Sequence, residues 1–320
     1  MSFFAMIRSR RSCGRSAALL CAGLALALAG CAPSPAGTSG MTFRYASPKA
    51  PLIVVEGYLG DARNKAAMVL DTGATAAYAA FLDTSVAQRM GLILSDEIVP
   101  ASSTAVGPRP RPYRTARLAR FELGPIVLHD VEVAVADWIA DMVPDADRRI
   151  GAIVGYHLLR ERVFSIDYLG RRLDLAASPG PEPAAIAFAL GRQKPLILVQ
   201  TTVNGAGPFT MEIDTGATTT ILAPAAARRA GIVPRPSPAT MSGAGGAVAV
   251  ETGAARIAFG GIERDIGQLV VMPAMAAIAA AAGTPIDGIL GTDFLYGARL
   301  TVDYPRRRLW LAAAPAAAAR

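Results

Sequence analysis

Short apolar runs that end in turn residues recur along the chain and predict strands. Leu52–Gly57 and Leu196–Val203 are β-branched or aliphatic, and the Asn204-Gly205 pair after the second run is typical of a hairpin turn. Runs of the same kind predict further strands at Phe121–Leu123, Val127–Val135, Phe209–Ile213, Ile257–Phe259 and Ile266–Val271. The pattern therefore predicts an all-β protein, made mainly of strands with short helices between them.

Turn and capping residues mark the short helices. Pro suits the first position of a helix, Gly its end, and Asp or Thr its N-cap. These signals predict one helix capped by Asp83 or Thr84 and ending at Gly91, a second from Pro224 to Gly231, and a third over Ala274–Ala282, closed by Gly283.

The chain repeats itself once. Met68-Val-Leu-Asp-Thr-Gly-Ala-Thr75 matches Met211-Glu-Ile-Asp-Thr-Gly-Ala-Thr218, and three further blocks match in the same order. The matching pairs are residues 150–155 with 286–291, 164–168 with 300–304, and 171–175 with 307–311. Four collinear blocks indicate a duplicated domain, with one copy over residues 42–176 and the other over residues 195–311. Prolines within residues 177–194 indicate a linker between the copies.

The first 30 residues have the pattern of an export signal. Four Arg precede an apolar run over residues 17–29, which is too short to cross a bilayer as a helix, since that needs roughly 20 residues. Leu28-Ala29-Gly30-Cys31 resembles a bacterial lipobox, so we expect a lipoprotein signal over residues 1–30, lipidation of Cys31 and a tether over residues 31–41. The protein would then be lipid-anchored in the bacterial cell envelope, facing the periplasm. Ordinary signal cleavage nearby, with Cys31 left as a free thiol, is the alternative.

Composition excludes several classes of protein. With 52% hydrophobic and 18% charged residues, the chain is not intrinsically disordered. The net charge of +7 invites a nucleic-acid function, but loss of the signal leaves 28 basic against 25 acidic residues, so we expect no nucleic-acid partner. Three Cys and two His are too few for a multi-ligand metal site, so we expect no metal and no cofactor. Residues 312–320 form a low-complexity tail.

The repeated Asp-Thr-Gly-Ala-Thr segment carries the candidate chemistry. A single Asp in such a turn is most often a turn or capping residue, but Asp71 and Asp214 occupy equivalent places in a duplicated fold. A pseudo-twofold axis would bring their carboxylates within hydrogen-bond reach, and the hydroxyls of Thr72 and Thr215 can tie the two turns together. Two close carboxylates share a proton, so one can act as a base while the other acts as an acid.

The pair of Asp-Thr-Gly motifs resembles aspartic proteases, and Asp-Thr-Gly-Ala resembles their retropepsin branch. Ile153-Val154-Gly155 and Ile289-Leu290-Gly291 are similar to the hydrophobic-hydrophobic-Gly element that supports the catalytic loop in that family. The resemblance implies two pseudo-symmetric retropepsin-like β-barrel lobes with the active site between them, and Asp71 and Asp214 as the catalytic dyad. It also implies catalytic-loop support from Thr72, Gly73, Ala74, Thr75, Thr215, Gly216, Ala217, Thr218, Gly155 and Gly291.

The same resemblance implies an aspartic endopeptidase that binds polypeptide in an extended conformation. Retropepsins usually pair two identical subunits, whereas this chain carries both halves, so we expect a monomer with intramolecular pairing of the lobes. Two alternatives stay open. One is a catalytically silent peptide-binding or scaffold lipoprotein that retains the fold. The other is an enzyme that works only as a higher oligomer, in which each Asp pairs with another chain.

A glycine-rich segment predicts a flap over the site. The candidate flap residues are Gly243, Ala244, Gly245 and Gly246. An ordinary flexible loop is the alternative. In the first copy the same interval is residues 105–113, where three prolines stiffen the chain. The copies also differ at Gly151-Ala152, where the second copy has Asp287-Gly288.

The residue after Asp-Thr-Gly bears on the pH of activity. Many pepsin-like enzymes have Ser or Thr there, and its hydroxyl can donate to the catalytic carboxylate. Ala74 and Ala217 remove both donors, so we expect the shared proton to be held to higher pH and activity to persist toward neutral conditions. His129 and His157 are expected to be structural rather than catalytic.

Overall fold

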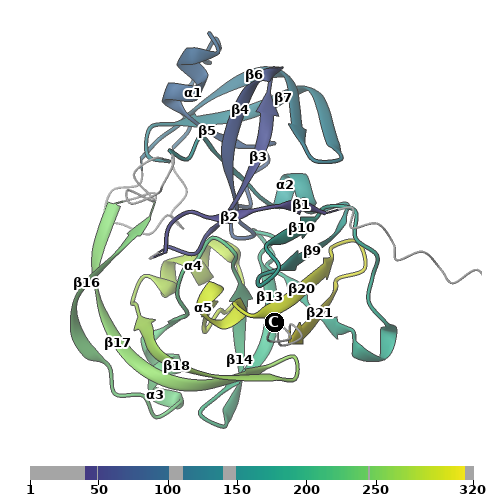
Figure 1. Ribbon diagram of the computed structural model, residues 1–320. Helices are drawn as coiled ribbons and strands as arrows, with labels where there is room; N and C mark the ends of the chain where they lie inside the picture. Colours follow the sequence, from purple (N-terminus) through teal and green to yellow (C-terminus); the bar gives the residue numbers. More distant parts are fainter. Residues whose placement is uncertain (1–39, 49, 101–110, 140–148, 244–245, 314–320) are drawn as a thin grey trace, which may run out of the picture. The chain divides into compact units, whose positions relative to one another are not determined.

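The computed structural model describes residues 40–48, 50–100, 111–139, 149–243 and 246–313 (Figure 1). The chain divides into two compact units, Met1–Thr38 and Ser39–Arg320, and every described residue belongs to the second unit. The predicted signal, Cys31 and residues 314–320 lie outside the described residues. Within the described ranges, no helix combines the length and apolar character needed to cross a membrane.

The first repeat forms one sheet that closes on itself. Its seven strands follow the order β2-β3-β4-β8-β5-β7-β6, and an additional pairing of β3 with β6 closes the sheet into a barrel. The strands are β2 (Arg44–Tyr45), β3 (Ile53–Leu59), β4 (Asp61–Leu70), β5 (Phe81–Asp83), β6 (Arg114–Leu123), β7 (Ile126–Ala136) and β8 (Ala152–Val154). The helices of this lobe are α1 (Thr84–Arg89) and α2 (Tyr156–Leu159).

The second repeat builds the same architecture. Its eight strands follow the order β12-β13-β14-β19-β15-β18-β17-β16, and a pairing of β13 with β17 closes this barrel. The strands are β12 (Ala189–Leu190), β13 (Ile197–Val203), β14 (Ala206–Ile213), β15 (Ile221–Leu222), β16 (Arg235–Gly243), β17 (Gly246–Phe259), β18 (Ile262–Val271) and β19 (Gly288–Leu290). The helices of this lobe are α3 (Pro224–Arg229), α4 (Met275–Ala282) and α5 (Thr292–Leu295).

A third sheet joins the two lobes. Its order is β1-β10-β9-β20-β21-β11, and at its centre β9 of the first repeat pairs antiparallel with β20 of the second. Side chains from this sheet and from both barrels share one hydrophobic core. The strands are β1 (Met41–Thr42), β9 (Val163–Asp167), β10 (Arg172–Asp174), β11 (Ile186–Ala187), β20 (Ala298–Asp303) and β21 (Arg308–Ala313). The prediction of a mainly β fold with two pseudo-symmetric lobes is confirmed.

Local signals account for the predicted helix ends. The Asp83 carboxylate accepts a hydrogen bond from the Ser85 amide at 3.0 Å and so caps α1. Gly91, Gly231 and Gly283 follow their helices with φ near +65°, at +64°, +69° and +62°, a conformation that strains residues with a side chain. The hairpin between β13 and β14 turns at Asn204-Gly205, where both residues have positive φ.

The segment between the repeats takes part in the sheets. It contains a 3-10 turn, η2 (Glu182–Ala184), followed by β11 and β12. Strand β11 pairs with β21 of the joining sheet, and β12 pairs with β13 of the second lobe. At the other end of the chain, β21 extends to Ala313, into the residues that we expected to be a tail. The lobe boundaries at residues 42, 176 and 195 stay predictions.

Candidate active site

Two equivalent strands deliver the two aspartates to the junction of the lobes. Strand β4 runs parallel to β8 and ends before Asp71, and β14 runs parallel to β19 and ends before Asp214. The Asp71 amide donates to the Val154 carbonyl at 2.9 Å, and the Asp214 amide donates to the Leu290 carbonyl at 3.1 Å. The parallel pairing therefore continues one residue past each strand and fixes where each turn begins.

Two buried threonines tie the turns together across the lobes. The Thr72 hydroxyl donates to the Ile213 carbonyl at 2.9 Å and accepts from the Thr215 amide at 3.1 Å. The Thr215 hydroxyl repeats this pattern, with the Leu70 carbonyl at 2.8 Å and the Thr72 amide at 3.1 Å. Both threonines are fully buried, so water does not compete for these four bonds. The turns are locked to one another as the pseudo-symmetry predicts.

The tie brings the two carboxyl groups into contact. Asp71 and Asp214 are hydrogen bonded to each other, and each lies against the glycine of the opposite turn. A Cβ atom on Gly216 would lie 2.4 Å from Cγ of Asp71, and one on Gly73 would lie 2.9 Å from Oδ2 of Asp214. Glycine is therefore needed at both positions for the close approach of the carboxyl groups, because any side chain there would separate them.

Backbone amides and burial shift the pKa of the two aspartates in opposite directions. Oδ1 of Asp71 accepts from the amides of Gly73 at 2.8 Å and Ala74 at 3.0 Å, and Oδ1 of Asp214 accepts from the Gly216 amide at 2.7 Å. Burial raises the pKa of both carboxyl groups, and the charge of Asp214 raises the pKa of Asp71 further, while these amides lower both. The pair therefore keeps a shared proton to higher pH than isolated aspartates would.

Two further glycines lie against the backbone of the two turns. A Cβ atom on Gly155 would lie 2.3 Å from the Ala74 carbonyl oxygen, and one on Gly291 would lie 2.5 Å from the Thr219 carbonyl oxygen. The residues that follow these glycines hold the turns: the Tyr156 amide donates to the Ala74 carbonyl at 2.9 Å, and the Thr292 amide donates to the Ala217 carbonyl at 2.8 Å. The Thr292 hydroxyl donates to the Thr218 carbonyl at 3.2 Å, and Thr75 is half-buried in the first turn.

Asp293 is a supporting residue that the sequence analysis did not single out. Its carboxylate accepts from the Thr220 amide at 2.8 Å and the Thr220 hydroxyl at 2.7 Å, which fixes the chain just after the second turn. The first repeat has His157 at the matching position, and burial lowers the pKa of this imidazole. Its Nδ1 is buried and has no hydrogen-bond partner among the described residues. Comparing the two repeats position by position would have exposed this difference.

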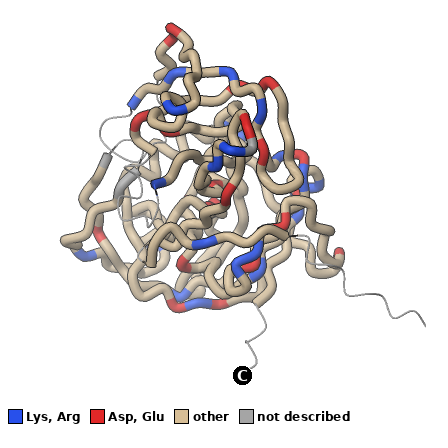
Figure 2. The backbone as a smooth tube through the Cα atoms, turned by 45° about the horizontal axis from the view of Figure 1, so that its top comes forward, with Lys and Arg blue, Asp and Glu red and all other residues tan. Residues whose placement is uncertain are grey.

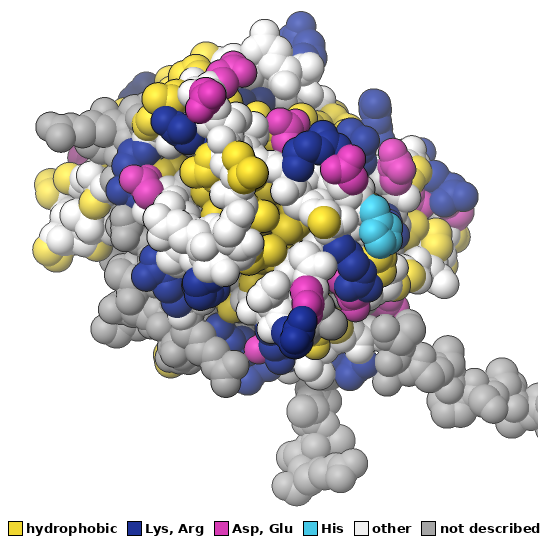
Figure 3. Space-filling view, turned by 90° about the horizontal axis from the view of Figure 1, so that it is seen from above, with side chains coloured by type: hydrophobic (Ala, Val, Ile, Leu, Met, Phe, Trp, Pro, Cys, Tyr) yellow, Lys and Arg dark blue, Asp and Glu magenta, His cyan; other side chains and the backbone are white. Residues whose placement is uncertain are grey.

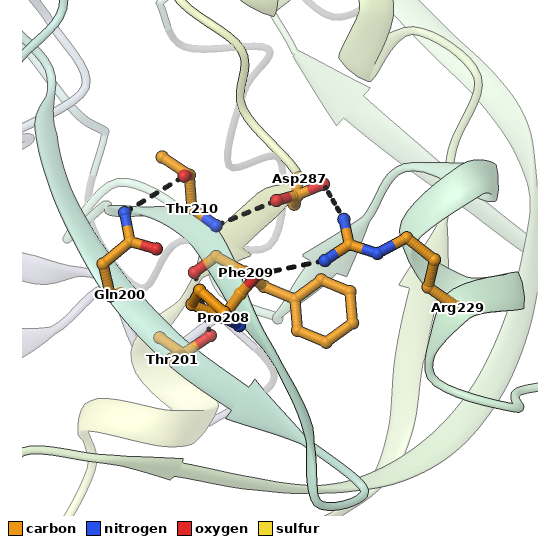
Figure 4. A network of polar contacts seen from close by, with 7 residues as sticks. All are labelled: Gln200, Thr201, Pro208, Phe209, Thr210, Arg229 and Asp287. Carbon is orange, nitrogen blue, oxygen red and sulfur yellow. Dashed lines mark hydrogen bonds and ion pairs between the residues drawn. The ribbon is translucent and has the colours of Figure 1, made fainter.

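The Asp287 difference between the repeats lies in a separate polar network, shown in Figure 4. Asp287 accepts from the Thr210 amide at 2.9 Å and from the Arg229 guanidinium at 3.1 Å. Arg229 also donates to the Pro208 carbonyl at 3.0 Å and lies over the Phe209 ring, 4.2 Å from its centroid. These contacts connect α3, β14 and the start of β19. Asp287 therefore stabilises the second lobe itself.

The predicted flap is the end of a long hairpin. Gly243 of β16 pairs with Gly246 of β17, while Ala244 and Gly245 lie outside the described residues. Met241 and Val248, opposite each other in this hairpin, pack on the same apolar cluster as Ala217 of the second turn. In the first repeat, residues 101–110 lie outside the described residues, and Tyr113 pairs with Val99. That the hairpin moves as a flap stays a prediction.

Surface charge is mixed over the described chain. Figure 2 shows Lys and Arg interspersed with Asp and Glu along the backbone. The face in Figure 3 shows exposed apolar side chains between charged groups of both signs. Among the residues that the structure describes, no group of three or more His, Cys, Asp or Glu is arranged to hold a metal ion.

Comparison with known proteins gives the family. The sequence model described as "Aspartyl protease" matches residues 55–158 and 199–294, one match for each repeat, and together they span more than half of the chain. Each match contains one of the two Asp-Thr-Gly turns. No curated protein matches the chain. The chain belongs to the retropepsin-like aspartyl protease family, with two copies of the lobe in one polypeptide.

Proposed function

We propose that the protein is an aspartic endopeptidase in which Asp71 and Asp214 together activate a water molecule. One observation carries the proposal: the two carboxyl groups are hydrogen bonded to each other, and buried threonines of both lobes hold them there. Both aspartates are half-buried rather than sealed, so water can reach them. A scaffold that only binds peptides has no use for two such acids, whose burial costs free energy.

The shared proton supplies both an acid and a base. The ionised carboxylate takes a proton from a water molecule as its oxygen attacks the peptide carbonyl carbon, and the protonated carboxyl gives its proton to the carbonyl oxygen. The C–N bond then breaks as the proton taken from water passes to the leaving amine. The second carboxyl recovers a proton from the hydroxyl of the tetrahedral intermediate. The pair returns to its singly protonated state, and one water molecule has been consumed.

The substrate class follows from the surroundings of the pair. Strand β16 of the β16–β17 hairpin stands at the edge of its sheet, and an extended peptide can pair with such an edge as a further strand. Packing of Met241 and Val248 on the cluster that contains Ala217 holds the hairpin next to the second turn. We therefore propose that the substrate is polypeptide in an extended conformation, held between this hairpin and the two turns.

The experiment is a digestion of a denatured protein mixture. Chain lacking the first 38 residues, with and without Asp71→Asn, is incubated with the mixture, and the products are identified by mass spectrometry. Internal cleavage that requires Asp71 supports the endopeptidase. Products that are equally abundant with the variant come from a contaminant, and an intact mixture under all conditions favours the silent scaffold.

We also propose that export and lipidation of Cys31 place the protein in the bacterial cell envelope, facing the periplasm. Support comes from the Arg-rich start, the short apolar run and the Cys at its end. A Cys31→Ser variant should then appear in the soluble fraction, while the wild type pellets with membranes. An equally soluble wild type would contradict lipidation.

A further inference from the structure

Glu212 places a carboxyl group on an otherwise apolar face of the second lobe. It lies on β14, opposite Leu198 of β13 and beside Ile289 of β19, so its side chain shares their face of the sheet. Leu198 and Ile289 both belong to the apolar cluster of that face, whereas Met211 and Ile213 point to the shared core. The Glu212 side chain is 3% exposed.

The first repeat shows that the fold does not need an acid here. The matching residue is Val69, which pairs with Val54 and Ile153, the counterparts of Leu198 and Ile289. All three belong to the equivalent apolar cluster of the first lobe. Burying a carboxyl group among apolar side chains costs free energy, which valine at this position avoids. The acid in the second repeat therefore calls for a functional explanation.

Its position connects it to the candidate active site. Glu212 is two residues before Asp214, which follows directly after β14 and continues its pairing with β19, so both side chains leave the same face of the extended chain. The cluster it enters is bounded by Ala217 of the second turn, by Met241 and Val248 of the β16–β17 hairpin, and by α4. Helix α4 contributes only Met, Ala and Ile side chains. Glu212 thus faces the apolar cluster on which both the second turn and the β16–β17 hairpin pack.

Three ionisable groups act on Glu212 by their charge. Burial raises the pKa of Glu212 well above its usual range, the charges of Asp214 and Asp71 raise it further, and Lys194 opposes them. Burial likewise lowers the pKa of Lys194, a half-buried residue just before β13, and Glu212 opposes that shift. Glu212 in turn acts on the phenol of Tyr304, whose pKa is raised by burial, by Tyr156 and then by Glu212, Asp71 and Asp214.

We propose that Glu212 is a positioning residue for the dyad: with Lys194, it sets how tightly Asp71 and Asp214 hold the proton that hydrolysis requires. The proposal rests on the endopeptidase function and deepens it. Three carboxyl groups and one ammonium group then titrate as a unit, and the protons leave in steps that belong to the cluster. A negative charge on Glu212 and a second negative charge on the dyad disfavour each other, and the Lys194 cation favours the charge on Glu212.

The test is the pH dependence of kcat/KM in four variants. Glu212→Gln keeps the size of the side chain and removes its charge, Glu212→Val installs the residue of the first repeat, and Lys194→Met removes the cation. Glu161→Gln, an acid that is 83% exposed, is the matched control for loss of one surface carboxylate. Thermal melting checks that each variant folds, and Glu212→Gln decides the test if Glu212→Val does not fold.

The expected shifts have opposite signs. Without the Glu212 charge the dyad ionises more easily, so the alkaline limb of the profile moves to lower pH, by about one pH unit. Lys194→Met moves that limb to higher pH, and Glu161→Gln leaves it unchanged. If the wild type is active and its pH profile overlays that of Glu212→Gln, the role proposed for Glu212 is wrong, while the endopeptidase function stands. A wild type with no cleavage dependent on Asp71 and Asp214 would overturn the endopeptidase function, and the inference with it.

Discussion

The two lobes carry the same turn in different electrostatic surroundings. In the first lobe the strand that leads to Asp71 has Val69 in an apolar cluster, and His157 follows the supporting glycine. In the second lobe the corresponding residues are Glu212 and Asp293. The hydrogen bonds of Thr72 and Thr215 across the lobes are nevertheless matched to within 0.1 Å, at 2.9 and 2.8 Å to the carbonyls and 3.1 Å to each amide.

The comparison distinguishes the residues that hold the two carboxyl groups in place from the residues that shift their pKa. The backbone, the threonines and the glycines are the same in both copies, because two turns that meet on a pseudo-twofold axis need the same shape. The side chains around the turns differ between the copies: Val69 and His157 in the first correspond to Glu212 and Asp293 in the second. These side chains affect the site through their charge and burial. The lobes should therefore respond alike to changes in the tie and differently to changes in these side chains.

Breaking the tie should have the largest effect, and an equal one in both lobes. Thr72→Val keeps the shape but leaves the Ile213 carbonyl and the Thr215 amide buried without their partner. We expect a loss of about 2–5 kcal/mol in the free energy of unfolding and loss of proteolysis, and the same for Thr215→Val. Chemical denaturation measures this, with Thr202→Val, an exposed threonine of β13, as the control. A loss in only one of the two variants would contradict the symmetric tie.

Replacing Glu212 should stabilise the second lobe. Glu212→Val exchanges a buried carboxyl for the residue of the first repeat, and we expect a gain of about 1–3 kcal/mol in the free energy of unfolding at neutral pH. A folded-state pKa above the unfolded value of about 4.3 gives stability that is present at acid pH and is lost as pH rises through the folded pKa. The gain from Glu212→Val should therefore shrink toward acid pH. Denaturation curves at several pH values measure it, and a gain that is independent of pH would contradict burial of an ionisable Glu212.

The outer supports should differ between the lobes. Asp293→Ala removes four hydrogen bonds, two from Thr220 and one each from Thr219 and Phe294, and we expect a cost of about 1–3 kcal/mol. His157→Ala removes a ring whose buried Nδ1 has no partner among the described residues, so its cost should stay below about 1 kcal/mol. Melting of both variants under one buffer measures the difference. Equal losses of stability would show that Asp293 and His157 stabilise their lobes equally, which would contradict the expected difference.

The smallest expected effect concerns Ala74 and Ala217. Serine at both positions would add hydroxyl donors next to the carboxyl groups, favour their ionised form and lower their pKa. We expect the pH–rate profile of the double variant to move toward acid by less than about one pH unit. A profile that overlays the wild type would show that the hydroxyls do not reach the carboxylates.

Local sequence was enough to predict the parts of the site that depend on shape. The Asp-Thr-Gly turns and Gly155 and Gly291 follow from motifs that the two copies repeat, even though the close approaches that these glycines allow join distant parts of the chain. The role of Glu212 was not predicted, because its neighbours Leu198 and Ile289 come from other strands. The pairing partner of β11, strand β21, likewise lies far away in the chain, and the sequence of this segment predicts only a linker.

The central claim is that Asp71 and Asp214 of one chain act as a single unit. The most direct measurement is the kcat/KM of Asp71→Asn, Asp214→Asn, the double variant, and an equal mixture of the two single variants, on a peptide identified in the digestion. The account predicts that each single variant loses roughly a thousandfold or more, that the double variant loses no more, and that mixing restores nothing. A single variant with near wild-type turnover would contradict the dyad. Activity regained on mixing would contradict pairing within one chain.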